Sequence, residues 1–143
     1  MKDFFVIGPV PTELIKKDID KHSAKTHIGA HSIFLGQVRA DTIDNKTVKG
    51  IEYSAPKELA NIKFAELKEA CIQKFQLSCL HIYHSVGFVP VGNISLFVLS
   101  SSPHRKEALD SIEWIVEQIK KEVPVFGKEI FEDGGYVWKE NRF

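Results

Sequence analysis

The chain has 143 residues, enough for one domain with a continuous hydrophobic core. Its composition is that of a globular protein, with 43% apolar and 27% charged residues, and its 19 basic and 19 acidic side chains leave no net charge. Bulk attraction to nucleic acid or to an anionic membrane is therefore disfavoured, and any anion binding must be local. The apolar run after Met1 is too short for a signal peptide or a membrane span, which predicts a cytoplasmic location.

The first half of the chain predicts strands and helices in alternation. Short apolar runs and helical spacing give, in order, a strand at 4–7, a helix from Thr12, a buried strand at 28–38 followed by Arg39, a loop at 40–47, a strand at 48–54 and a helix opened by Pro56. This part of the chain carries one basic side chain at a strand end, Arg39.

The second half begins with a strand at 77–86, in which His81 and His84 fall on opposite faces. A turn at 90–92, a strand at 93–100, a helix within 101–129 and a hairpin of strands at 125–132 and 136–139 complete the pattern. This order predicts an α+β fold, a single domain over 1–143 with a mostly antiparallel sheet and packed helices.

Neither the cysteines nor the histidines indicate a metal site or a cofactor. Cys71 and Cys79 are eight positions apart, with no C-x-x-C pair and no Cys/His spacing typical of zinc. The opposite orientation of His81 and His84 argues against a shared metal ion, so we expect structural or interfacial histidines and two buried, reduced cysteines.

The helix within 101–129 has an unusual start. Ser102 is suited to the N-cap and Pro103 to the first helical position, which places His104 and Arg105 in the first turn, where acidic residues usually lie. Cations at the electropositive end of a helix suggest an external anion such as a phosphate.

Further cations follow at Lys120, Lys121 and Lys128. Lys120 and Lys121 also fit the simpler role of complementing the negative end of the helix dipole, and Lys128 fits a solvent-facing position in its strand. If these residues converge with Arg39, they would surround a phosphorylated small molecule, and a lysine among other cations would have a lowered pKa.

Three segments, GAHSIFLGQVR, SSPHRKEA and KKEVPVFGKEIFEDGGYVWKEN, together resemble the large catalytic subunit of molybdopterin synthase, the MoaE family. The resemblance covers nearly the whole chain and implies an α/β-hammerhead fold. It also implies a homodimer within a heterotetramer, completed by a small ubiquitin-like sulfur-carrier subunit with a Gly-Gly C-terminus. The implied reaction moves sulfur from the carrier's thiocarboxylate to cyclic pyranopterin monophosphate and forms the molybdopterin dithiolene, without a metal or another cofactor.

The same resemblance assigns roles to individual residues. It implies that Arg39, His104, Arg105 and Arg142 bind the substrate and that Lys120 is catalytic. A second family lysine is expected at the position of Gly127, so we expect Lys128 to replace it through a bulge or local twist.

Two other functions remain open from the sequence. The substitution at Gly127 is compatible with a non-catalytic protein that binds the carrier tail without turnover. Without the resemblance, the pattern of cations favours an unrelated domain that binds a phosphorylated ligand.

Overall fold

A computed structural model describes residues 2–139. Its elements are β1 (Phe5–Ile7), α1 (Thr12–Lys21), the short 3-10 helix η1 (His22–Ala24), β2 (Ala30–Gln37), β3 (Thr42–Ile43), β4 (Lys46–Ser54), α2 (Lys57–Phe75), β5 (Cys79–Pro90), β6 (Ile94–Ser102), α3 (Arg105–Glu122), β7 (Phe126–Phe131) and β8 (Tyr136–Trp138). The strands pair in the order β2-β6-β5-β4-β7-β8, all antiparallel, while β1 pairs with β5 in parallel and β3 pairs with β4. The predicted α+β class and the mostly antiparallel sheet are confirmed.

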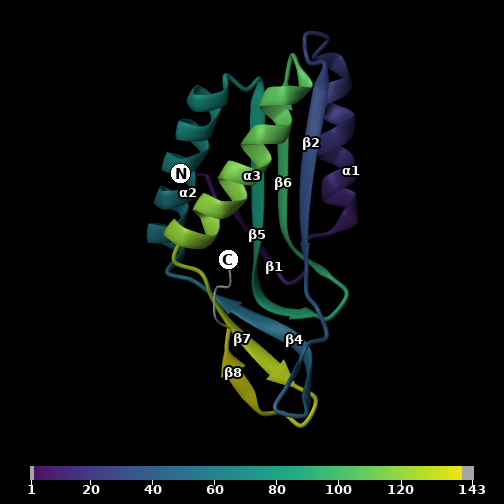
Figure 1. Ribbon diagram of the computed structural model, residues 1–143, viewed down its shortest axis with the longest axis vertical. Helices are drawn as coiled ribbons and strands as arrows, with labels where there is room; N and C mark the ends of the chain where they lie inside the picture. The colour runs from purple at the N-terminus through teal and green to yellow at the C-terminus, as the bar shows by residue number, and fades with distance from the viewer. Residues whose placement is uncertain (1, 140–143) are drawn as a thin grey trace.

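The long strand β5 joins two parts of the sheet. Its first half, Cys79–His84, pairs with β6, and its second half, Gly87–Pro90, pairs with β4. Figure 1 shows the result: α2 and α3 lie along one face of the upper sheet and α1 along the other, while β4, β7 and β8 form a smaller lobe beneath the C-terminal end of α3.

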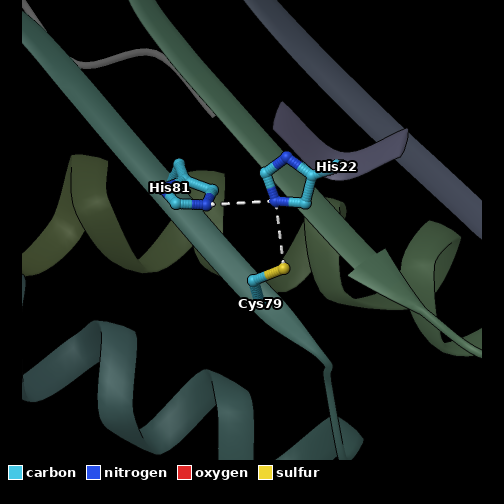
Figure 2. Close-up of side chains that lie close together, drawn as sticks. All are labelled: His22, Cys79 and His81. Carbon is cyan, nitrogen blue, oxygen red and sulfur yellow. Dashed lines mark hydrogen bonds between the residues drawn. The ribbon is translucent and has the colours of Figure 1, made fainter. Parts of the chain in front are cut away.

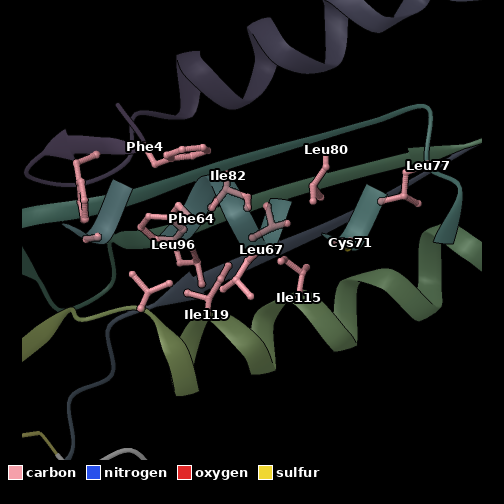
Figure 3. Close-up of a cluster of buried hydrophobic side chains, with 14 residues drawn as sticks. Phe4, Phe64, Leu67, Cys71, Leu77, Leu80, Ile82, Leu96, Ile115 and Ile119 are labelled. Carbon is pink, nitrogen blue, oxygen red and sulfur yellow. The ribbon is translucent and has the colours of Figure 1, made fainter. Parts of the chain in front are cut away.

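The main core lies between the sheet and the helices α2 and α3. Phe4, Phe64, Leu80, Ile82 and Ile115 are at most 1% exposed there (Figure 3). Burying one such side chain stabilises the fold by roughly 1.5–3 kcal/mol. This packing fixes α3 against the sheet and so determines where the last turn of α3 lies.

Two sequence predictions about local structure are wrong. The predicted loop at 40–47 is instead a tight β3–β4 hairpin, in which Asp44 and Asn45 adopt positive φ values of 51° and 65°. Asn and Asp tolerate this conformation, which the hairpin turn requires.

The start of α3 also differs from the prediction. The N-cap is His104, with an extended backbone, and the helix begins at Arg105, because Ser102 still belongs to β6. Ser102 instead donates its hydroxyl hydrogen bond to the carbonyl of His104. Glu107 lies in the first turn, so this helix start does carry the usual acidic residue.

The predicted alternation along β5 is confirmed. His84 points to the face covered by α2 and α3, where it contacts the rings of Phe5 and Phe64, and His81 points to the α1 face, where it contacts His22. Burial lowers the pKa of each histidine to about 4, so both imidazoles are neutral at pH 7. Within residues 2–139, no helix is both long and apolar enough to cross a membrane.

Candidate active site

A cavity of about 850 Å³ opens between the end of β2, the C-terminal end of α3 and the lobe formed by β4, β7 and β8. We call this cavity the cleft. Apolar side chains such as Phe34, Ile51 and Val123 form part of its wall, next to the polar Tyr53 and His84. Its volume suits a small organic ligand.

Four cationic side chains from three parts of the chain line the cleft. Arg39 follows β2, Lys120 and Lys121 lie in the last turn of α3, and Lys139 follows β8. Arg39 is largely exposed and forms a 3.4 Å ion pair with Asp41, which is a weak interaction in solvent. The convergence predicted for Arg39 and Lys120 is therefore present in the structure.

Lys120 lies close enough to Lys139 and Arg39 to be influenced by their charges. Partial burial of its ammonium group lowers its pKa, and the positive charges of Lys139 and then Arg39 lower it further. A lysine with a lowered pKa exchanges its proton more readily near neutral pH than an ordinary lysine does. Lys120 is thus suited to proton transfer as well as to binding an anion.

Lys139 pairs with the only buried carboxylate that lines the cleft among residues 2–139. Its Nζ lies 3.7 Å from Oε1 of Glu129, a residue that is 6% exposed. The other oxygen, Oε2 of Glu129, is buried and has no hydrogen-bond partner. A buried carboxylate oxygen without a partner is costly, and a ligand donor in the cleft would compensate for it.

Lys128 lies outside the cleft. Its Nζ sits 4.6 Å from the centre of the Tyr136 ring and 5.1 Å from that of Trp138, on the face of β7 opposite to Gly127. The bulge expected at Gly127 is absent, because Gly127 pairs with Tyr53 and the register stays regular as far as Ile130; the register shift of this ladder lies between Val48 and Gly50 of β4.

Lys139 occupies the place where the sequence suggested a missing lysine. It lies directly opposite Gly127, and its backbone N–H donates a 2.8 Å hydrogen bond to the Gly127 carbonyl. A Cβ atom built on Gly127 would lie 3.7 Å from the Cβ of Lys139, so both positions project from one face of the hairpin. Sequence reasoning missed Lys139, although the Asp133–Gly135 turn implies this pairing.

The other predicted ligands are not brought into the cleft of this chain. His104 and Arg105 are exposed at the start of α3, whereas Lys120 lies in its last turn, about 22 Å further along the axis. Arg142 lies outside the residues that the structure describes.

Together, these features define a protein whose cleft suits a small anionic ligand and has amines in its lining. The family model described as MoaE protein matches residues 11–122. The molybdopterin synthase catalytic subunit of Emericella nidulans is 35% identical over 139 residues, which cover 94% of this chain and 71% of that protein. This chain therefore belongs to the MoaE protein family.

Solved structures agree with this assignment. The crystal structure of molybdopterin synthase from Staphylococcus aureus matches with a TM-score of 0.83 and 32% identity, over 99% of both chains. A complex of subunits 1 and 2 of the molybdopterin-converting factor from Helicobacter pylori matches with a TM-score of 0.79, over 96% of this chain and 90% of that one. At 22% identity, the second match shows the shared fold alone.

Proposed function

We propose that this MoaE-family protein is the catalytic subunit of a molybdopterin synthase, a sulfurtransferase of molybdenum cofactor biosynthesis, and that sulfur transfer takes place in the cleft. The main evidence for this function is that Arg39, Lys120 and Lys139 all line one cavity of about 850 Å³. A phosphorylated pterin such as cyclic pyranopterin monophosphate matches this cavity in size and charge.

The three cations take different parts in the reaction. Arg39, with its fixed fork of donors, binds the phosphate of the precursor. Lys120 transfers a proton as the carrier's sulfur attacks and oxygen leaves, because its pKa is lowered. Lys139, rather than Lys128, supplies the second lysine amine of the site, and Glu129 orients it.

The sulfur donor is a small ubiquitin-like carrier subunit whose Gly-Gly tail carries the thiocarboxylate. The Helicobacter match is a complex of two subunits, which supports a second subunit as the partner. Phe126 and Trp138 line the cleft and are 54% and 52% exposed, so they provide an apolar entrance for an extended tail.

His104 and Arg105 contribute through a second copy of the chain. Within one chain they are too far from Lys120 to share its ligand, so their predicted role in substrate binding requires a homodimer inside the heterotetramer. The exposed Ile33 and Leu35 on the edge strand β2 leave apolar surface for such an assembly. The role of Arg142 in substrate binding and the cytoplasmic location stay predictions.

A single-turnover assay tests the function. Purified protein is mixed with thiocarboxylated carrier and precursor, and the dithiolene product is measured by mass spectrometry, with carrier lacking the thiocarboxylate as the control. We expect product only with the thiocarboxylated carrier. If the protein binds the carrier but yields no product, it is a non-catalytic binding protein and the proposed activity is wrong.

Mixing two inactive variants tests the role of the second copy. An Arg105→Ala chain and a Lys120→Ala chain, each inactive alone, should regain part of the activity when co-expressed, because one cleft of each mixed dimer retains both groups. If co-expression restores nothing although mixed dimers form, Arg105 does not act across the dimer.

A further inference from the structure

A second group of reactive side chains lies on the face of the sheet covered by α1. His22 opens η1 directly after α1, and Cys79 and His81 lie on one face of β5, 57 and 59 positions along the chain. Figure 2 shows the three side chains pointing toward one another. Nε2 of His22 lies 3.1 Å from Sγ of Cys79 and 3.2 Å from Nε2 of His81, and one ligand atom from each residue lies within 4.8 Å of the others.

The hydrogen bonds of His22 fix its tautomer. Its Nδ1 lies 2.5 Å from the carbonyl oxygen of Asp18, which can only accept a hydrogen bond. Nδ1 therefore carries the proton, and Nε2 offers a single lone pair. Both Cys79 and His81 approach that lone pair, which can accept a full hydrogen bond from only one of them.

We propose that His22, Cys79 and His81 form a three-ligand site for a thiophilic d10 metal ion, with Cu(I) as the preferred ion. Such an ion accepts the lone pairs of all three donors at once and so resolves their competition. Metal bonds of about 2.0–2.3 Å place neighbouring ligand atoms about 3.3–3.7 Å apart. The two separations from His22 need to widen by only a few tenths of an ångström, and the ligand atoms of Cys79 and His81 lie within 4.8 Å of each other. The backbone carbonyl that holds His22 is a typical outer partner of a metal-binding histidine.

Access and burial are compatible with uptake of an ion. His22 is 4% exposed, whereas Cys79 and His81 are partly exposed, so an ion can enter from their side. Binding converts the Cys79 thiol to a thiolate with release of one proton and leaves both imidazoles neutral.

The surrounding charges favour a monovalent ion. Nζ of Lys25 lies 3.7 Å from Sγ of Cys79, and Lys68 and Lys2 are close enough to influence His81. One thiolate with Zn²⁺ would leave a net positive charge next to these ammonium groups, whereas one thiolate with Cu(I) is neutral. Zinc also usually takes four ligands, whereas this group offers three.

The proposed site is separate from the cleft. His81 and Cys79 face α1, whereas His84 lies three positions after His81, so it is on the other face and lines the cleft. Metal binding is therefore expected to be independent of sulfur transfer, and its test does not depend on the proposed function.

Anaerobic titration with Cu(I) against a chromophoric Cu(I) chelator tests the proposal. The wild-type protein should withdraw one equivalent of Cu(I) from the chelator. Loss of an outer partner of a metal ligand typically weakens affinity by about 10–100-fold, so Cys79→Ser and His81→Gln should each weaken binding by at least about 100-fold. Copper K-edge absorption of the loaded protein should report one sulfur and two imidazole ligands.

Matched controls come from the same chain. Cys71→Ser changes the other cysteine, which is buried in the core, and His27→Gln changes an exposed histidine outside the group. Both controls should bind Cu(I) like the wild type, and circular dichroism should show that all four variants are folded. Unchanged copper binding in folded Cys79→Ser and His81→Gln would overturn the site, and displacement of bound copper by excess Zn²⁺ would overturn the preference for a monovalent ion.

Discussion

The two faces of strand β5 carry groups of opposite chemical character. On one face, the cleft gathers the charged Arg39, Lys120 and Lys139 around open space. On the other, a nitrogen donor of His22 and the sulfur of Cys79 contact each other directly. Both groups have lysines nearby, so positive charge alone does not say what a site binds. Positive charges around a cavity suit an anion, whereas nitrogen and sulfur lone pairs that point at one another suit a soft metal ion.

Lys120→Ala should produce the largest effect on the cleft. Removing the amine with the lowered pKa eliminates proton transfer, and we expect sulfur transfer to slow by about 10²–10⁴-fold in the single-turnover assay. Lys106→Ala on the same helix is the control, because Lys106 is exposed and pairs with Asp110 along the helix surface. A parental rate for Lys120→Ala would remove Lys120 from the mechanism.

Comparing Lys128 with Lys139, which lie on the two arms of the β7–β8 hairpin, shows which of them supplies the second amine of the site. Lys139→Ala should slow sulfur transfer by roughly 10–100-fold, because Lys139 lines the cleft and contacts Glu129. Lys128→Ala should leave the rate within about 2-fold and reduce stability by about 0.5–1 kcal/mol, through loss of its contacts with Tyr136 and Trp138. The reverse order of effects would return the catalytic role to Lys128.

A lysine introduced at position 127 should partly rescue the loss of Lys139. In the double variant Gly127→Lys, Lys139→Ala, the new side chain projects from the same face as residue 139, and we expect about a tenfold recovery over Lys139→Ala. The introduced Cβ would lie 3.0 Å from Cγ2 of Ile51, which must move slightly. No recovery in a folded double variant would show that an amine on this face is not what the reaction needs.

Sequence patterns predicted the helices and strands better than the contacts between them. Helical spacing and the Asp133–Gly135 turn located α2, α3 and the β7–β8 hairpin, because these signals are local. The start of α3 was missed by two residues because Ser102 extends β6, and pairing between strands outweighs the local capping preference of a serine.

The candidate site was only partly predictable for the same reason. Arg39 and Lys120 were identified by their places at element ends, whereas Lys139 became visible only once the hairpin register set it opposite Gly127. The group of His22, Cys79 and His81 left no signal, because its members are brought together across 57 positions by packing of α1 on the sheet. Tertiary contacts of this length cannot be read from local spacing.

Lys139→Ala should also change the titration of Lys120. The charge of Lys139 contributes to the lowered pKa of Lys120, so its removal should raise that pKa while partial burial still holds it below the ordinary value. Because the ammonium form is lost as pH rises through the pKa, Lys120 should stay charged to higher pH in the variant. NMR of isotopically methylated lysines can measure this shift, with Lys106→Ala as the control. A lower or unchanged pKa would mean that the two ammonium groups do not interact.

Cys79→Ser should have the smallest effect on sulfur transfer and is the sharpest comparison of the two faces. Cys79 lies on the α1 face, and α3 and the cleft lie on the other, so we expect a rate within about 2-fold of the wild type while copper binding is lost. A large loss of sulfur transfer with an unchanged melting temperature would show that the two faces are coupled through β5. His81 and His84 belong to the same strand but face opposite sides of the sheet. Copper bound by His81 could therefore affect sulfur transfer in the cleft only through a change in β5 itself.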